Sequence, residues 1–453
     1  MPVTPRSPEA KNATINLDIP DLTIAQGSTR TLRRLVTAQL QQTWRQFLQV
    51  PAAALSGANR LLHQRVVLQM QALQRREPSL PLQLLRQPTI STLIHCIQRQ
   101  MRPGGDRVAL NRWLREACAL LALEMAGAGL LSQPVELVAL DGEGLPTLLS
   151  PALNVRIRPQ GQAHRLILDN GQLQLSGPPQ DLSGTALRLD LHHIEDGSHP
   201  LALVDRPYHE IVPGILLALA DNNPLSDYEA HPDKHGNQLD LGGQPLQRWL
   251  TELRWSLELV QQHLPLLAEE MRLLLRLVIP VGWHEERHLS ASYQEAVGLI
   301  YLTLHPQPMT MAEALVHEFQ HNKINAAFHL DPLLVNAWFP LVKSPVRPDL
   351  RPLHGVLLAV HAFQPVAELY ALMLEGAHPL AANTSWRQRF HKILQLDQQG
   401  AATVLAHAQP TPAGAPLLAE MRLLDQRLAA RELAIFGEGR ATDGDFDELA
   451  GHN

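Results

Sequence analysis

The segment "HEFQH", residues 317–321, contains the pattern H-E-x-x-H. In a helix, His317 and His321 would lie one turn apart on the same face, because residues i and i+4 of an α-helix are neighbours. Two imidazoles in that arrangement can share one metal ion, and Glu318 between them can reach a metal-bound water. The pattern therefore predicts a metal centre with His317 and His321 as ligands and Glu318 as a catalytic residue.

A second copy of the pattern, "HEERH" at residues 284–288, shows that the motif alone is not specific. That copy has no apolar helical flank to hold two imidazoles in place, so we interpret it as a polar connection. Ala312, Leu315 and Phe319 give the other copy an apolar face on which a helix can pack. The alternative for residues 317–321 is an ordinary amphipathic helix whose histidines lie at the edge of a core.

A catalytic metal centre needs a third protein ligand as well as open positions. Downstream, His354, His361 and Glu368 are spaced by seven residues, so they form one stripe along a predicted helix. A histidine on a largely apolar helix needs a partner if it is buried, which makes His361 the first choice and His354 the second. Glu368 would instead complete a triad of two histidines and one carboxylate. The alternative is that one of the three binds metal and the others are ordinary polar residues.

Two chemistries fit such a centre. In a zinc metallopeptidase, Glu318 is the general base that activates the metal-bound water. In an iron oxygenase no base is required, and Glu318 orients a histidine or a bound water. The H-x-x-G-x-x-H continuation of some peptidases is missing after His321. A third alternative is a peptide-binding protein without catalysis, against which the intact His317, Glu318 and His321 argue.

The stretch "HEFQHNKINAAF", followed by "SPVRPDLRPLHGVLLAVHAF", resembles the 2-oxoglutarate-dependent HExxH-type peptide β-hydroxylases. These are the "HEXXH motif domain" proteins of ribosomal peptide modification clusters, and the resemblance covers about residues 200–375. It implies a mononuclear Fe(II) site, with 2-oxoglutarate and O₂ as cosubstrates. The expected activity is that of an Fe(II)/2-oxoglutarate-dependent dioxygenase that hydroxylates a side-chain β-carbon of a ribosomally made precursor peptide. A zinc metallopeptidase is the alternative.

The resemblance also directs attention to Arg347 and Arg351 in "SPVRPDLRP". The distal carboxylate of 2-oxoglutarate is best matched by the bidentate guanidinium of an arginine. Prolines on both sides of these arginines restrict the chain and reduce the entropy lost when the arginines are positioned. We expect one of the two to bind 2-oxoglutarate; the alternative is a pair of loop arginines associated with Asp349.

Two further segments bear on the substrate. The polar loop "DNNPLSDYEAHPDKHGN" is long enough to cover the site, or it is a solvated loop with local Asx turns. The stretch "SASYQEAVG" offers backbone groups to which an extended peptide could add as a strand, or it is an internal strand of a sheet.

The elements that position these residues predict an α+β fold that is predominantly helical. A β-rich segment of alternating apolar and polar residues interrupts the helical patterns, and we interpret it as an antiparallel sheet layer. The H-E-x-x-H helix is expected to follow a strand. Helical patterns include residues 80–103, the stretch "YHEIVPGILLALAD" after residue 207, and one long helix after residue 244. The expected divisions are a helical region 1–132, a β-rich segment 133–206, a helical catalytic region 207–440 and an acidic flexible tail 441–453.

Composition limits the partners and the compartment. The 453 residues carry 38 Lys and Arg against 44 Asp and Glu, so the formal net charge is −6, which gives no reason to expect nucleic acid or an anionic membrane as partner. The two cysteines, Cys96 and Cys118, imply no disulfide framework. The first twenty residues lack the apolar core of a signal peptide, and the apolar runs considered are too short to span a bilayer. We expect a cytoplasmic protein.

Overall fold

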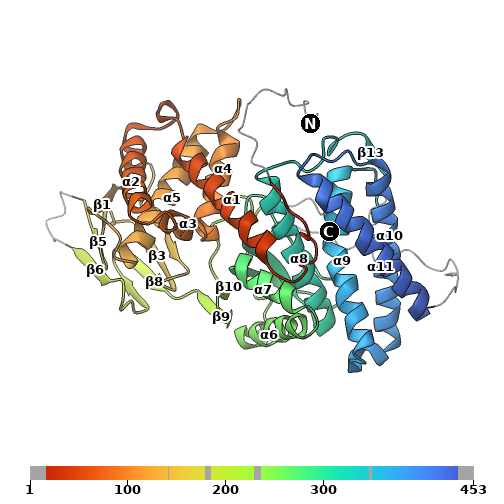
Figure 1. Ribbon diagram of the computed structural model, residues 1–453. Helices are drawn as coiled ribbons and strands as arrows, with labels where there is room; N and C mark the ends of the chain where they lie inside the picture. The colour runs from red at the N-terminus through yellow and green to blue at the C-terminus, as the bar shows by residue number, and fades with distance from the viewer. Residues whose placement is uncertain (1–16, 141, 179–184, 229–235, 346–348, 437–453) are drawn as a thin grey trace.

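The computed structural model describes residues 17–140, 142–178, 185–228, 236–345 and 349–436, and its mixed α+β architecture confirms the predicted fold class. Figure 1 shows an elongated arrangement, with the N-terminal helices and the first strands at one end and the C-terminal helices at the other. The predicted tail 441–453 lies outside the described residues.

Five helices open the described chain: α1 (Arg30–Leu48), α2 (Gly57–Arg76), α3 (Leu80–Leu85), α4 (Pro88–Gln100) and α5 (Arg107–Gly127), with a short 3₁₀ helix at Ala52–Ala54. The single helix predicted over residues 80–103 is wrong, because the chain leaves helical geometry at Gln87. The ring of Pro88 disfavours a helical conformation at the residue before it, and Pro88 instead starts α4.

Two antiparallel four-stranded sheets follow, with strand orders β1-β4-β5-β6 and β2-β3-β8-β7. Most of their strands alternate buried residues with exposed or partly exposed ones, as expected for sheets with one face on a core, whereas β2 is buried throughout. The bounds are β1 (Val135–Val138), β2 (Leu148–Ser150), β3 (Val155–Pro159), β4 (Arg165–Asp169), β5 (Gln172–Ser176), β6 (Ala186–Asp190), β7 (Gly197–His199) and β8 (Ala202–Asp205).

A third sheet, in the order β12-β11-β10-β9, separates the two halves of the molecule. The helix expected after residue 207 is wrong: β9 (Tyr208–Val212) and β10 (Ile215–Ala218) form an antiparallel hairpin. Pro213 and Gly214 provide the turn, and Gly214 has φ +88, a conformation that favours glycine. Then β11 (Leu277–Trp283) and β12 (Leu299–Leu304) add in parallel.

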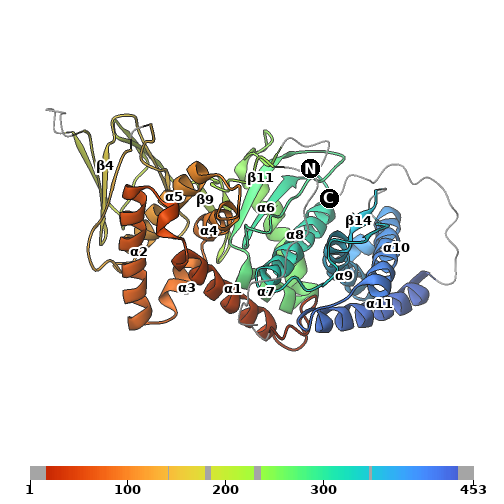
Figure 2. The ribbon, with the colours of Figure 1, turned by 90° about the horizontal axis from the view of Figure 1, so that it is seen from above.

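The remaining helices lie on one side of this sheet, and the C-terminal ones lie farther from it than the others (Figure 2). They are α6 (Leu246–His263), α7 (Pro265–Leu274), α8 (Pro308–Phe328), α9 (Leu353–Glu375), α10 (Thr384–His407) and α11 (Gly414–Phe436), joined by the short pair β13 (Leu341–Val342) and β14 (Arg351–Pro352) and a 3₁₀ helix at Pro379–Ala382. The long helix expected after residue 244 is two helices, since Pro265 starts α7.

The third sheet takes part in two hydrophobic cores. Leu277, Ile279 and Tyr301 point into the core formed with α2, α4 and α5, whereas Val278 and Ile300 point into the core formed with α6–α11. Successive residues of a strand face opposite sides of the sheet, so each face of this sheet packs on one of the two cores. Among the described helices, α9 alone is long and apolar enough to cross a membrane, and 89% of its apolar window is buried inside the protein.

Candidate metal centre

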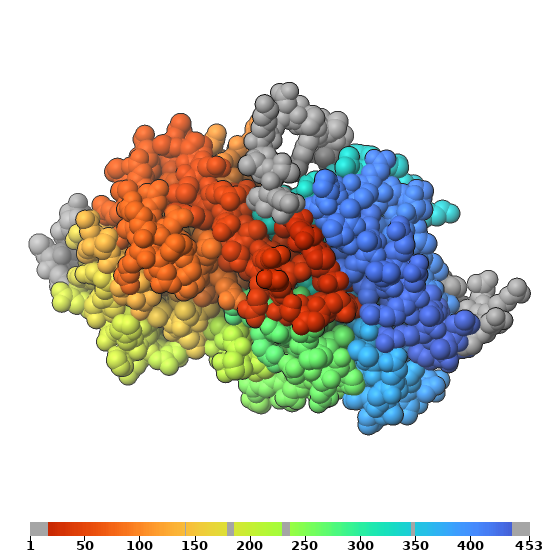
Figure 3. Space-filling view, in the orientation of Figure 1, coloured from red at the N-terminus to blue at the C-terminus, as the bar shows by residue number. Residues whose placement is uncertain are grey.

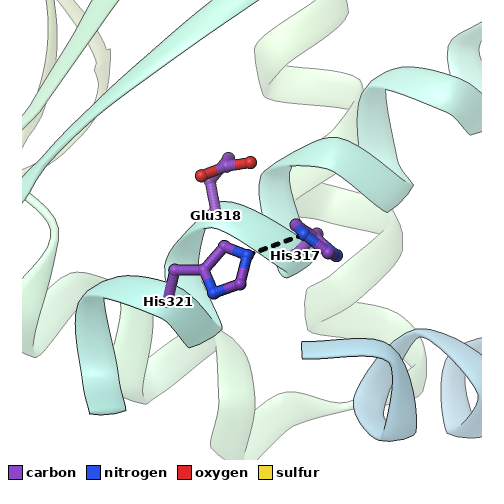
Figure 4. A group of neighbouring side chains, drawn as sticks. All are labelled: His317, Glu318 and His321. Carbon is purple, nitrogen blue, oxygen red and sulfur yellow. Dashed lines mark hydrogen bonds between the residues drawn. The ribbon is translucent and has the colours of Figure 1, made fainter. Parts of the chain in front are cut away.

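The centre is built on helix α8, which follows β12 after a short connection. Met311, Leu315 and Phe319 are almost fully buried in the core that α8 shares with the third sheet and α9. His317 and His321 meet on one side of α8, with their Nε2 atoms 2.8 Å apart, and Glu318 projects beside them (Figure 4). The three residues offer ligand atoms within 4.8 Å of one another, and within the described residues no other group of three does so.

Two serines hold Glu318. Ser290 Oγ donates to one carboxylate oxygen at 2.6 Å and Ser292 Oγ donates to the other at 2.7 Å. Asn322, one turn further along α8, donates to Ser292 Oγ at 3.3 Å and to the Leu299 carbonyl at 3.0 Å. The carboxylate is therefore fixed between α8 and the segment that precedes β12, with both oxygens already accepting hydrogen bonds.

The donor set fits a divalent transition metal. Nitrogens bound at 2.0–2.1 Å to one tetrahedral ion lie about 3.3 Å apart, so the two Nε2 atoms, which are 2.8 Å apart, would separate by about 0.5 Å to share one ion. Burial lowers the pKa of His321, against the opposing effect of Glu318, so its ring is neutral at pH 7 as a ligand must be. The alternative is a simple hydrogen bond between the two rings.

His354 and His361 lie on α9, which packs against α8, but neither belongs to the group of three. The His354 ring stacks on Trp338 and packs on Phe328, with ring centroids 4.8 and 4.5 Å away. Burial, followed by the charge of His321, lowers the pKa of His354 to about 4. It is therefore a neutral, partly exposed imidazole held by aromatic contacts near the metal centre.

His361 is fully buried, and neither of its ring nitrogens makes a hydrogen bond of ordinary geometry with the described residues. Burial, the ammonium of Lys323 and His321 lower its pKa well below the ordinary value, while the Leu22 backbone acts in the opposite direction. Lys323 is itself paired with Glu270 at 2.5 Å. The first-choice third ligand thus lies close to a fixed positive charge.

Glu368 serves another purpose. Its Oε2 binds Arg431 at 2.6 Å and Arg427 at 3.2 Å, and these arginines lie on α11. A carboxylate committed to two guanidinium groups joins α9 to α11 and is not available to a metal on α8. The heptad spacing of His354, His361 and Glu368 therefore does not bring them to one centre.

Only one of the two arginines predicted to bind 2-oxoglutarate lies within the described residues. Arg347 lies outside the described residues, as does the middle of the loop at 229–235. Arg351 is in β14, 32% exposed, and its Nε lies 3.0 Å from a carboxylate oxygen of Asp349. To bind a cosubstrate carboxylate, the Arg351 guanidinium would have to break its ion pair with Asp349 or bind both carboxylates at once.

The second copy of the motif is not helical. His284 follows β11, and its Nδ1 accepts hydrogen bonds from the backbone N–H groups of Glu286 and Arg287 at 3.1 and 3.0 Å. Because residues 284–288 form no helix, they do not place two imidazoles one helical turn apart as α8 does.

Several supporting residues were not predicted from the sequence. Ser290 and Ser292 could have been found, because residues two apart in an extended segment share a face. The N-terminal segment gives no such signal: the Thr23 carbonyl accepts from Gln320 and Lys323 of α8, and Glu420 accepts from the Thr23 and Ile24 N–H groups. Figure 3 shows this first part of the chain lying between the N-terminal helices and the C-terminal helices.

Neither the models of known protein families nor the curated proteins include a match to the chain.

Proposed function

We propose that the protein is an Fe(II)/2-oxoglutarate-dependent oxygenase that hydroxylates a β-carbon of a peptide. The observation that carries this choice over a zinc peptidase is the state of Glu318. A general base must accept a proton from a metal-bound water, but both Glu318 oxygens already accept serine hydroxyls at 2.6 and 2.7 Å. Such a carboxylate is better suited to orienting a neighbour than to taking up a proton.

The residues have distinct roles in this proposal. His317 and His321 provide two neutral nitrogens for iron, and His354 provides the third, because it is partly exposed and, unlike that of His361, its pKa is not lowered by the buried Lys323 ammonium. When bound, the iron and 2-oxoglutarate would activate O₂ for attack on a C–H bond. Phe363, with its ring 4.7 Å from His317, keeps the ring of that ligand in place and excludes water on that side.

The binding of 2-oxoglutarate rests on the resemblance and on the chemistry of arginine. Arg351 can exchange its Asp349 partner for a cosubstrate carboxylate, since surface ion pairs of this kind contribute only about 0–1 kcal/mol. Arg347→Leu and Arg351→Leu separate the two candidates by titration of 2-oxoglutarate against the iron-loaded protein. The functional arginine should lose tens of fold in affinity while iron stays bound.

The test of the function is succinate formation. The iron-loaded chain is incubated with 2-oxoglutarate, O₂ and a candidate precursor peptide, and succinate and a peptide mass gain of one oxygen atom are measured together. Coupled formation of both supports the proposal. Cleavage of the peptide by the zinc-loaded chain, with no succinate from the iron-loaded chain, would instead establish a peptidase.

A further inference from the structure

The segment just before β12 forms the outer edge of the third sheet. β12 is the terminal strand in the order β12-β11-β10-β9, and Ala291 pairs with Tyr301 of β12 in antiparallel fashion. The N–H of each donates to the C=O of the other at 3.0 Å. Residues 290–292 therefore add a short extended layer outside β12.

The backbone groups on either side of Ala291 point the other way. In an antiparallel pair, neighbouring residues direct their N–H and C=O groups alternately toward and away from the partner strand. Within the described residues, the backbone N–H and C=O of Ser290 and Ser292 make no hydrogen bond, and both residues are partly exposed. Two sets of backbone donors and acceptors are thus presented at this edge.

This edge lies directly beside the metal centre. The side chains of Ser290 and Ser292 face α8 and bind the two oxygens of Glu318. A strand added here would pass alongside Glu318, and the side chains on one of its faces would point toward the His317 and His321 pair.

The sequence of this edge lacks the residues that usually prevent strand addition. Exposed edges commonly carry charged residues, proline or a bulge that prevents pairing with another chain. The sequence "LSASY" at 289–293 has no charge and no proline, and its three central side chains are small. Close approach of another backbone is therefore permitted at the position where it would meet the centre.

We propose that an extended peptide binds by pairing its backbone with Ser290 and Ser292. The inference rests on the proposed function in taking the substrate to be a peptide, and it specifies how that peptide is held. Recognition through backbone groups tolerates many sequences, whereas side chains at alternate positions face the metal centre or solvent. The modified residue and residues two positions away face α8, and the residues between them vary freely.

The experiment uses a random dodecapeptide library displayed on phage and panned against the full chain. Enriched peptides are synthesised and their affinities measured by fluorescence anisotropy, without iron or 2-oxoglutarate. Each is then N-methylated at one backbone nitrogen at a time. We expect losses of about tenfold or more at alternate positions, the effect of a lost hydrogen bond with the partner left unpaired. No enriched peptide, or losses without a period of two, would overturn the proposal.

Variants and hydrogen exchange locate the binding edge. Ser290→Pro and Ser292→Pro remove the N–H donors and should weaken peptide binding about tenfold, more than Ser290→Ala and Ser292→Ala, which keep the donors and remove only the hydroxyls that bind Glu318. In the wild type, the Ser290 and Ser292 amides should exchange more slowly once peptide is bound. Unchanged exchange at both amides would contradict the proposal even if the proline variants fail to fold.

These experiments distinguish failure of the proposed peptide-binding edge from failure of the proposed oxygenase activity. Alternating N-methyl sensitivity without succinate formation keeps the peptide edge and rejects the oxygenase. Succinate formation with a peptide that is insensitive to N-methylation keeps the oxygenase and rejects the edge.

Discussion

The two H-E-x-x-H copies of this chain share a pattern and differ in structure. At 317–321 the pattern lies in the middle of α8, and its two imidazole Nε2 atoms converge. At 284–288 it follows the end of β11, with three exposed residues between the histidines and a turn closed on the His284 ring. The apolar flanks decide between these outcomes, because only a helix anchored on a core can hold residues i and i+4 against a common ligand.

The residue after the glutamate gives the largest expected contrast between the copies. Phe319 is fully buried, whereas its counterpart Glu286 is exposed. Phe319→Ala should lower the free energy of unfolding by about 3–5 kcal/mol through lost burial and a cavity, and Glu286→Ala should change it by less than about 0.5 kcal/mol. Urea denaturation measures both. Equal effects would mean that α8 does not depend on its apolar flank.

The ion pair that anchors α8 to α7 provides a second contrast. Lys323 and Glu270 are 0% and 1% exposed and lie 2.5 Å apart, while the adjacent Glu269 pairs with Arg33 at the surface. Glu270→Gln leaves a buried ammonium without its counter-charge and should cost about 3 kcal/mol. Glu269→Gln should cost less than about 1 kcal/mol. A small loss for Glu270→Gln, measured by the same denaturation, would show that the pair does not hold α8.

Substitution of the glutamate in each motif copy compares the chemistry of the two copies rather than their contribution to stability. Glu318→Gln should reduce succinate formation by about 10–100-fold with iron retained, as expected for a group that orients the centre. Glu285→Gln, in the exposed copy, should leave the rate unchanged. Complete loss for Glu318→Gln, together with zinc-dependent peptide cleavage by the wild type, would favour a general base and a peptidase.

A smaller effect concerns the C-terminal end of α8, for which the exposed copy has no counterpart. His329 stacks on His95 with ring centroids 4.0 Å apart, and burial lowers the pKa of both rings. Below pH 6.5 the unfolded chain binds protons that the folded chain does not, so stability should fall as the pH falls. The slope is at most about 1.4 kcal/mol per pH unit for each histidine.

His329→Gln provides the control for this pH effect. The amide can still donate to the Gln294 carbonyl, which His329 Nε2 contacts at 2.7 Å, but it does not titrate. The pH slope of the unfolding free energy between pH 6.5 and 5 should become shallower in this variant. A slope equal to that of the wild type would show that His329 is not responsible.

The sequence predicts what depends on local pattern and misses what depends on distant contacts. Alternation between residues 134 and 205 correctly indicates strands, and the periodicity of α8 places His317 and His321 on one face. The sequence wrongly predicts a helix at 208–218, where the chain forms a hairpin, because a short apolar run fits both periods. Partners far away in the chain, such as Glu368 with Arg431, leave no local trace, so the heptad stripe on α9 overstated the number of ligands.

Iron content of two matched double variants tests the central claim most directly. Wild type, His317→Ala with His321→Ala, and His284→Ala with His288→Ala are loaded with Fe(II) under anaerobic conditions, desalted and measured by elemental analysis, with circular dichroism as the folding control. The account predicts one iron per chain in the wild type and in the 284/288 variant, and almost none in the 317/321 variant. Full iron in the folded 317/321 variant, or loss of iron only in the 284/288 variant, would contradict it.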